Sequence, residues 1–222
     1  MEKFHVAEKF VSINGEGTRA GQLAVFVRFT GCGLSCSYCD TKWANEKDAP
    51  FTPMTAQEIY SYIKETGVTN VTLTGGEPLM QSGIGELISM ICADSSLYCE
   101  IETNGAVSIA EYAELETPPA FTMDYKLPSS GMEGAMLADN FKYLTKKDTV
   151  KFVSGSEKDL ERAKEIMEQY SLYGKVSLYI SPVFGKIEPA KIVEFMKINK
   201  LNGVNLQLQM HKIIWSPDMK GV

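Results

Sequence analysis

The chain has 222 residues, of which 44% are hydrophobic, and its 28 acidic and 22 basic residues give a formal net charge of −6 at pH 7. This composition indicates a globular protein with a hydrophobic core, and the acidic balance argues against nucleic acid as a partner. The first ten residues carry charges of both signs, unlike a signal peptide, and no apolar run is long enough to span a membrane. We therefore expect a cytoplasmic protein.

Short apolar runs alternate with helical patterns along the chain. Strands are predicted at residues 23–29, 68–73, 97–102, 120–126, 149–153, 176–180 and 204–208. Helices are predicted from Thr55, where Glu58 completes a capping box, then at residues 83–93, 108–116 and 156–170, and from Pro189. Strands that alternate with helices in this way form parallel sheets with right-handed crossovers.

The number of these units predicts an open barrel. A complete parallel β/α barrel takes about 250 residues, and this chain holds only about six β/α units. We therefore predict that residues 1–222 form a single domain with the α/β fold of a partial, open parallel β/α barrel. Such barrels bind ligands at the carboxyl ends of their strands, where this chain has polar or glycine-rich segments at Cys32 and at residues 75–77, 102–105, 124–126 and 181–182.

Three cysteines, Cys32, Cys36 and Cys39, lie in one short loop after the first predicted strand. In a reducing compartment, clustered cysteines indicate a metal site more often than disulfides. Three thiolates are one fewer than the usual set for a 4Fe–4S cluster, which leaves one iron open to the amine and carboxylate of an outside cofactor. A zinc knuckle is the alternative, but structural zinc normally takes four ligands, and no fourth cysteine or histidine is near.

The next predicted strand ends in the sequence Gly-Gly-Glu-Pro at residues 75–78. Glycines there can expose backbone to a ligand, and Glu77 can accept a bond from an ammonium group; an ordinary strand-to-helix turn is the alternative. The cysteine loop, with Tyr38 before its last cysteine, and this segment together resemble the radical S-adenosylmethionine (SAM) superfamily. Residues 12–17, 39–41 and 209–212 narrow the resemblance to the 7-carboxy-7-deazaguanine synthase family.

The resemblance implies a radical SAM lyase of 7-deazapurine (queuosine-type) biosynthesis, with the partial barrel of that superfamily. Its cofactors would be a 4Fe–4S cluster, S-adenosyl-L-methionine and Mg²⁺. A 5′-deoxyadenosyl radical would take hydrogen from C6 of 6-carboxy-5,6,7,8-tetrahydropterin, the ring would contract, and ammonia would leave to give 7-carboxy-7-deazaguanine. A flavodoxin-like one-electron donor and a homodimer are also implied.

The resemblance assigns roles to particular residues, and no side chain is itself catalytic because the cofactor carries the chemistry. Cys32, Cys36 and Cys39 would hold the cluster, Thr41 would bind magnesium, and Asp40 would support it through water. The cofactor-binding residues would be Ser37, Tyr38, Gly76, Glu77, Glu102, Asp124, Tyr125, Lys126, Ser129, Ser181 and Pro182. The substrate-binding residues would be Ile13, Asn14, Gly15, Glu16, Arg28, Thr74 and His211.

Elementary chemistry leaves alternatives open at several of these positions. Asp and Thr suit magnesium, but they are also common helix caps. Arg28 lies in an apolar strand and needs an anion, either a substrate carboxylate or an internal partner such as Glu16 or Glu102. Asn14-Gly15 also fits a plain turn, residues 124–126 a solvated strand end, and a lone histidine such as His211 is usually structural.

Two other functions share parts of this pattern. A glycyl-radical activating enzyme has the same cysteine spacing and Gly-Gly-Glu-Pro turn, but residues 14–17, Arg28 and residues 39–41 argue against it, and it would need a protein partner. A non-catalytic iron–sulfur electron carrier is the other, and three cluster ligands with a polar strand edge argue against it.

Overall fold

The computed structural model describes residues 2–217 and 219–222. Among these residues, nine strands form one sheet in the order β3-β1-β2-β4-β5-β6-β7-β8-β9. The strands are β1 (Phe4–Ile13), β2 (Leu23–Phe29), β3 (Thr52–Met54), β4 (Asn70–Gly75), β5 (Tyr98–Thr103), β6 (Ala120–Tyr125), β7 (Thr149–Ser154), β8 (Ser177–Pro182) and β9 (Val204–Leu206).

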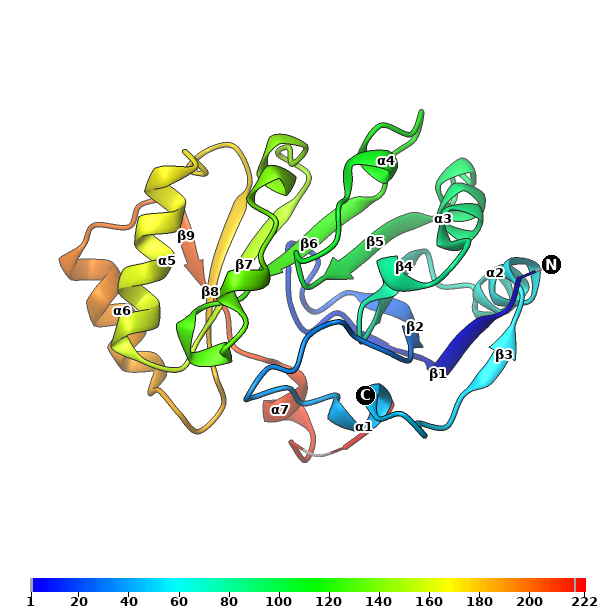
Figure 1. The fold of residues 1–222 in the computed structure, drawn as a ribbon, viewed down its shortest axis with the longest axis horizontal. Helices are drawn as coiled ribbons and strands as arrows, with labels where there is room; N and C mark the ends of the chain where they lie inside the picture. The colour runs from blue at the N-terminus through cyan, green and yellow to red at the C-terminus, as the bar shows by residue number, and fades with distance from the viewer. Residues whose placement is uncertain (1, 218) are drawn as a thin grey trace.

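Every neighbouring pair from β2 to β9 is parallel, as the alternation of strands and helices predicted. The α-helices are α1 (Lys42–Asn45), α2 (Ala56–Thr66), α3 (Ile84–Ala93), α4 (Ala110–Ala113), α5 (Glu157–Gln169), α6 (Pro189–Ile198) and α7 (His211–Ile214). The short 3₁₀ helices are η1 (Pro78–Met80), η2 (Pro128–Ser130), η3 (Glu133–Ala135) and η4 (Ala138–Lys142). Figure 1 shows the sheet curving while its two edges, β3 and β9, stay apart, which confirms the open partial barrel.

Two strands at one edge were not predicted from the sequence. β1 pairs antiparallel with β2 on one side and with β3 on the other, so the sheet is mixed at this edge. In β1, the buried Phe4 and Val6 alternate with charged or half-buried residues. That alternation fits a strand with one solvated face, but the charges of the segment also fit a solvated terminus.

The hydrophobic core lies between the sheet and the long helices. The capping box at Thr55 is formed as predicted, and it sets α2 so that Ile59 and Ile63 are fully buried. Leu87 of α3 is likewise buried against the sheet. Because side chains alternate along a strand, the residues between the core positions point to the opposite, inner face.

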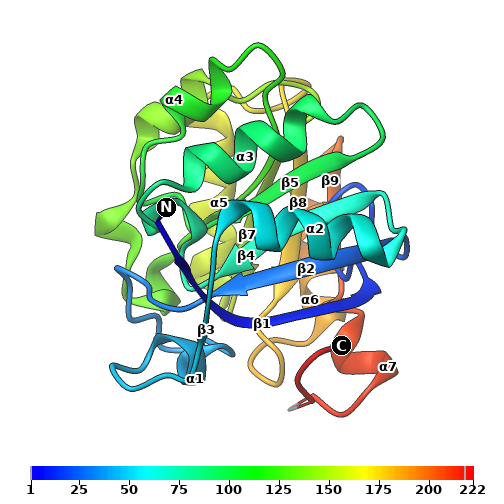
Figure 2. The same ribbon diagram turned by 90° about the vertical axis from the view of Figure 1, so that its right-hand side faces the viewer.

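The inner face of the sheet is polar. Cross-strand neighbours on this face include Thr72, Glu100, Thr122, Asp124 and Lys151. Figure 2 places α1 and α7 below the sheet, as does Figure 1, so the cysteine loop and the C-terminal segment both lie at this end. No helix within residues 2–217 and 219–222 is long and apolar enough to cross a membrane.

Candidate active site

The loop that carries the cysteines is fastened across the carboxyl ends of the strands. Ser37 donates from its backbone N–H to the Ser130 carbonyl at 3.0 Å and from its hydroxyl to the Ser129 carbonyl at 2.7 Å. The Tyr38 hydroxyl donates to the Val153 carbonyl at the end of β7 at 3.2 Å. These bonds attach the loop to the ends of β6 and β7, so Ser37, Tyr38 and Ser129 of the predicted set are brought together.

The three thiols face polar groups that suit a cluster. Cys36 is buried and Cys32 and Cys39 are half-buried, and all three are free. The Asn104 amide donates to Cys32 Sγ at 3.4 Å. Burial raises the pKa of Cys36, and the nearby Lys126 ammonium opposes this by favouring the thiolate. Within the described part of the chain, no three Cys, His, Asp or Glu side chains converge as ligands of a single ion.

Gly75 and Gly76 allow two backbones to approach closely. A Cβ on Gly76 would lie 1.8 Å from the Gly31 carbonyl oxygen and 2.2 Å from Asn45 Oδ1, and one on Gly75 would lie 2.3 Å from the Phe29 carbonyl oxygen. Gly75 also has a φ of 137°, which side chains disfavour. The glycines therefore serve the contact between the end of β4 and the start of the cysteine loop.

Glu77 points into the protein, where backbone and hydroxyl groups of the chain bind its carboxylate. It is fully buried, and its oxygens accept from the Asn104 backbone N–H at 2.7 Å, the Leu79 backbone N–H at 3.1 Å and the Thr103 hydroxyl at 3.0 Å. These bonds occupy both carboxylate oxygens. The side chain therefore joins the turn after β4 to the turn after β5.

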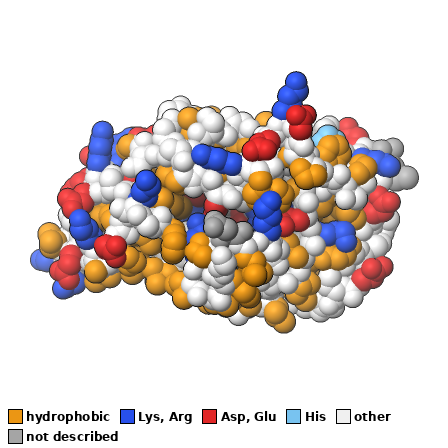
Figure 3. All heavy atoms as spheres, turned by 90° about the horizontal axis from the view of Figure 1, so that it is seen from below, with side chains coloured by type: hydrophobic (Ala, Val, Ile, Leu, Met, Phe, Trp, Pro, Cys, Tyr) orange, Lys and Arg blue, Asp and Glu red, His pale blue; other side chains and the backbone are white. Residues whose placement is uncertain are grey.

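Charged side chains gather on the inner face of the sheet. Lys151 Nζ contacts Glu16 Oε2 and lies 3.7 Å from Asp124 Oδ2. Lys126 Nζ lies 2.9 Å from the same Asp124 oxygen. Figure 3 shows charged side chains of both signs near the middle of the lower face, bordered by hydrophobic ones. The pKa of Lys151 is raised: burial acts against this, but the charges of Glu16 and Asp124 outweigh it.

Arg28 and Glu102 are held by partners within the protein. Arg28 Nε pairs with Glu8 Oε1 at 2.7 Å, so its internal partner is Glu8 of β1, whereas the sequence had offered Glu16 or Glu102. Thr74 donates its hydroxyl to Glu102 Oε2 at 2.7 Å. Burial raises the pKa of Glu102, and the positive charge of Lys151 opposes this.

Five buried polar atoms among the described residues have no hydrogen-bond partner. They are Glu16 Oε1, Asn45 Oδ1, Asp124 Oδ1, Ser154 Oγ and Ser181 Oγ. Folded proteins pair nearly all such atoms, so each of them calls for an external partner. Three belong to residues assigned to substrate or cofactor from the sequence, and they lie on the loop before β2 and at the ends of β6 and β8. These atoms, most of them hydrogen-bond acceptors, therefore fit a polar cofactor and substrate beside the cysteine loop.

The loop before β2 is anchored to the sheet by Asn14. The Asn14 Oδ1 accepts from the Thr72 hydroxyl at 3.0 Å, and its Nδ2 donates to Glu100 Oε2 at 3.4 Å. Its amide is therefore used within the protein. Next to it, a Cβ on Gly15 would lie 3.3 Å from His211 Nδ1, which brings α7 against the loop. Burial lowers the pKa of His211. Ile13 is half-buried at the end of β1.

Tyr125 is the predicted site residue whose ring the structure does not bring to the inner face. Its ring lies 5.8 Å from the Phe141 ring and 5.9 Å from the Phe152 ring, in the core on the helical side of the sheet. Asp124, its neighbour in the strand, faces the other way. At the end of β8, Ser181 and Pro182 are both buried.

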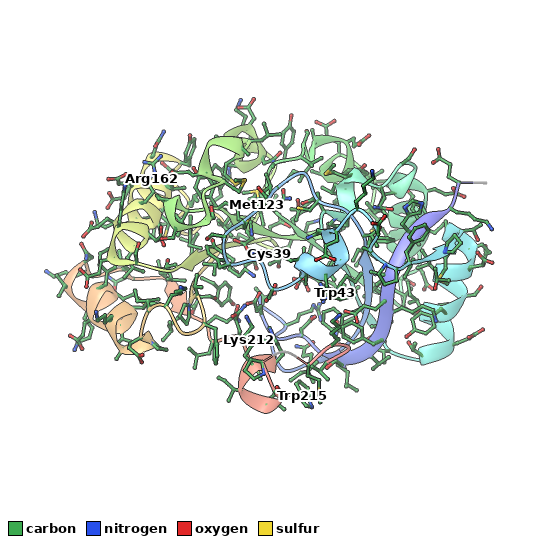
Figure 4. All side chains as sticks on the ribbon, turned by 60° about the horizontal axis from the view of Figure 1, so that its bottom comes forward. Cys39, Trp43, Met123, Arg162, Lys212 and Trp215 are labelled. Atoms are coloured by element: carbon green, nitrogen blue, oxygen red, sulfur yellow. The ribbon has the colours of Figure 1, made fainter. Side chains whose placement is uncertain are left out.

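Asp40 and Thr41 lie between the cysteine loop and α7. Thr41 precedes α1, but its side chain makes no capping bond, and its Oγ1 lies 3.6 Å from Cys39 Sγ. Asp40 pairs with Lys212 of α7 at 3.3 Å. Figure 4 shows Lys212 and Cys39 on this side of the molecule, and the Lys220 ammonium lies 3.9 Å from the centre of the Trp43 ring. The C-terminal segment thus folds back over α1.

Comparison with known proteins agrees with this geometry. The sequence profile of the Radical SAM superfamily matches residues 26–126, which include the cysteine loop and the turn after β4. The chain is 61% identical over 219 residues to the 7-carboxy-7-deazaguanine synthase of Clostridium acetobutylicum, covering 99% of each chain. The chain belongs to the 7-carboxy-7-deazaguanine synthase family. The synthase of Chlorobaculum tepidum is 38% identical and matches 98% of this chain and 97% of its own length.

The fold agrees as well. The crystal structure of QueE from Escherichia coli has a TM-score of 0.71 to this chain, with 19% sequence identity, over 93% of this chain and 94% of that one. As a member of the 7-carboxy-7-deazaguanine synthase family within the radical SAM superfamily, the protein uses a 4Fe–4S cluster and S-adenosylmethionine. The three thiols and the unpartnered polar atoms beside them fit these groups.

Sequence reasoning missed several residues of the site. Lys151 is a charged residue within an apolar strand, the same signal that singled out Arg28. Glu8 was missed because β1 was not predicted. Glu100 is likewise a charged residue in an apolar strand, and Lys212 belongs to residues 209–212 of the family pattern, but only the fold brings both of them, with Ser154, to this side of the molecule.

Proposed function

We propose that this protein is a 7-carboxy-7-deazaguanine synthase that converts 6-carboxy-5,6,7,8-tetrahydropterin to 7-carboxy-7-deazaguanine with loss of ammonia, for 7-deazapurine biosynthesis. The observation that carries the proposal is the pairing of a three-cysteine loop with buried, unpartnered carboxylate oxygens of Glu16 and Asp124. Relatives that match nearly the whole chain bear the name of this activity.

The residues of the chain bind and orient in this proposal. When bound, the cluster and S-adenosylmethionine supply a 5′-deoxyadenosyl radical for hydrogen abstraction. Cys32, Cys36 and Cys39 hold the cluster, while Asp124 and Ser181 offer acceptors to the cofactor. The loop that crosses the strand ends keeps water away and leaves one hydrogen of the substrate in reach.

The substrate is bound by residues of the loop before β2, of β2 and of the segments next to them. Glu16 Oε1 accepts hydrogen bonds from the donor-rich edge of the pterin, because an ionised carboxylate is an acceptor only. Arg28, which is half-buried beside Glu8, faces the substrate carboxylate. Thr41 gives a hydroxyl oxygen to Mg²⁺, a hard ion that prefers oxygen and often bridges to a substrate, and Asp40 supports it through water. His211 closes the site against Gly15.

The remaining assignments complete the proposal. The chain acts as a single domain in the cytoplasm, assembles as a homodimer and receives electrons from a flavodoxin-like donor. It takes neither nucleic acid nor membrane as a partner, which its net charge of −6 supports.

The test is anaerobic reconstitution of the cluster followed by product analysis. With a reductant, S-adenosylmethionine and the tetrahydropterin, we expect 5′-deoxyadenosine and a product with the mass of 7-carboxy-7-deazaguanine. An electron carrier would be reduced without forming 5′-deoxyadenosine. A glycyl-radical activating enzyme would form it only with a protein partner, and that result would overturn the proposal.

A further inference from the structure

Lys151 occupies the centre of the charged inner face, and the family resemblance assigned it no role. Its side chain and that of Glu16 are each only 11% exposed. It comes from the middle of β7, directly opposite Asp124 of β6 in the parallel register. Its ammonium therefore stands on rigid backbone between a carboxylate of the substrate loop and a carboxylate of the sheet.

The two carboxylates share a pattern. Lys151 binds Oε2 of Glu16 and approaches Oδ2 of Asp124, while Oε1 of Glu16 and Oδ1 of Asp124 are buried without a partner in the described structure. Asp124 has a second cation, Lys126, at 2.9 Å. Glu16 has no other ion pair among the residues that the structure describes, so Lys151 is its one positive partner there.

We propose that Lys151 is a positioning residue for the substrate: its ion pair with Glu16 fixes that carboxylate so that the free oxygen, Oε1, receives the N–H groups of the pterin. This inference rests on the proposed function, because it takes Glu16 as a substrate ligand. It goes further by assigning the orientation of that ligand to a residue of β7 that does not itself contact the pterin.

The physical reason is the cost of burying an unpaired charge. A buried carboxylate without a cation becomes protonated more easily, because the charged form is poorly solvated. A protonated Glu16 would carry a hydrogen where the pterin edge also presents hydrogens, and an acceptor would be lost. One strong bond to Oε2 also removes the rotational freedom of the carboxylate, so Oε1 is pre-oriented before the substrate arrives.

Other titratable groups also lie near Lys151 on the elements around it. They are Tyr38 and Asp40 of the cysteine loop, Glu100 and Glu102 of β5, Lys126 after β6 and His211 of α7. Glu102 is the remaining carboxylate whose charge acts on Lys151 after Glu16 and Asp124. Glu102 also accepts a hydrogen bond from the Thr74 hydroxyl. It would keep this bond if Lys151 were removed, whereas Glu16 would be left without a partner among the described residues.

The experiment measures ligand affinity on the cluster-loaded, unreduced enzyme by anaerobic calorimetry. The probes are 6-carboxypterin, a stable aromatic analogue of the proposed substrate, and S-adenosylmethionine. For Lys151→Met we expect the affinity for 6-carboxypterin to fall about tenfold or more at neutral pH. The affinity for S-adenosylmethionine should change much less, because Asp124 retains Lys126.

The charge of residue 151 separates this role from general loss of structure. Lys151→Arg retains the charge and should restore the affinity of the wild type for 6-carboxypterin. Lys151→Gln keeps a donor without the charge, and it replaces the methionine variant if that one does not fold. Lys175→Met is the matched control, since among the described residues the Lys175 ammonium donates only to the Phe141 carbonyl, at 2.6 Å.

The outcomes of these measurements test the role of Lys151 separately from the proposed function. Binding and conversion by the wild type, together with unchanged affinity for 6-carboxypterin in both uncharged Lys151 variants, would overturn the role of Lys151 alone. A wild type that neither binds 6-carboxypterin nor converts the tetrahydropterin would overturn the proposed function, and the inference with it. The expected combination is selective loss of pterin affinity in the uncharged variants and rescue by arginine.

Discussion

Asn14 donates its side-chain amide to the buried carboxylate of Glu100 at 3.4 Å, and this bond ties the proposed substrate loop to the inner face of the sheet. The other oxygen of Glu100 accepts from the Thr122 hydroxyl at 2.5 Å. Burial, and then the charge of Glu102, raise the pKa of Glu100 from 4.5 to about 7. The anchor of the loop is thus a carboxyl group that changes its charge near neutral pH.

Replacement of Glu100 by glutamine should flatten the pH dependence of stability. Between pH 4.5 and about 7 the folded state binds the proton of Glu100 more tightly than the unfolded state does, so stability falls as pH rises through this window. The difference amounts to about 3 kcal/mol. Glutamine has no such titration and keeps an acceptor for Thr122.

The measurement is the thermal midpoint of the cluster-loaded protein across this window. The midpoint of the wild type should drop toward neutral pH, and that of Glu100→Gln should drop less. Glu194→Gln, which removes a charge from the surface of α6, serves as the control. Equal drops in the wild type and Glu100→Gln would show that Glu100 does not titrate in this interval.

Gly76→Ala should prevent assembly of the cluster loop. The new Cβ would lie 1.8 Å from the Gly31 carbonyl oxygen, next to Cys32, and backbone atoms cannot move aside as a flexible side chain can. We expect a loss of about 3 kcal/mol or more in stability. Gly134→Ala is the matched control, because its Cβ would meet nothing within 4 Å. Iron content after reconstitution checks both, and a full cluster in Gly76→Ala would contradict the close contact.

Cys36→Ala should abolish the cluster while the sheet remains folded. Cys36 lies at the middle of the loop, is buried, and faces Lys126, so its removal leaves two thiols on the outer parts of the loop. Visible absorption and iron analysis report the cluster, and circular dichroism reports the fold. Cys92→Ala on α3 is the control, and it should keep both the cluster and the activity. A complete cluster in Cys36→Ala would remove this cysteine from the ligand set.

Much of the fold could be predicted from the sequence because each parallel strand is a single apolar run along the chain. The runs from β2 to β9 are short, apolar and separated by helices, which leaves little choice of topology. β1 was harder to predict, since its pairing with β2 is antiparallel. Its charged residues also make the alternation of buried and exposed positions difficult to recognise in the sequence. Without β1 in the predicted sheet, no sequence argument could place Glu8 opposite Arg28, where the register puts it.

In the site as well, local features could be predicted from the sequence, but contacts between distant residues could not. The spacing of the cysteines is local, so the loop could be recognised directly. At Tyr125 the period of the strand gives the direction of the ring, because its neighbour Asp124 faces inward and the tyrosine ring must then face the core. Lys151 could have been selected by its charge in an apolar strand, but its partner Glu16 is distant in the sequence, and only the fold brings them together.

Thr41→Ala should retain the cluster and weaken the response to magnesium. The Thr41 hydroxyl makes no capping bond and lies 3.6 Å from Cys39 Sγ, so its removal leaves α1 and the thiols in place. Loss of one oxygen ligand should raise the magnesium concentration needed for half-maximal turnover by about tenfold. Thr41→Ser keeps the hydroxyl and should behave as the wild type. The proposed magnesium role fails if the alanine variant responds to magnesium as the wild type does.

Glu77→Gln distinguishes a structural role from direct contact with the cofactor. The carboxylate accepts from two backbone N–H groups and the Thr103 hydroxyl, and a glutamine amide would turn an N–H toward one of these donors. A buried donor left without an acceptor costs about 2 kcal/mol. The Asn104 turn, which also donates to Cys32 Sγ, should then shift and alter the electron paramagnetic resonance spectrum of the reduced cluster.

Direct contact between Glu77 and the cofactor would give a different result for the same variant. If the carboxylate instead received the ammonium group of S-adenosylmethionine, Glu77→Gln would weaken cofactor affinity while leaving the thermal midpoint of the cofactor-free protein unchanged. The structure favours the opposite order, because Glu77 has no exposed surface and both of its oxygens are occupied. Calorimetric affinity and the thermal midpoint, measured on the same preparation, decide between the two.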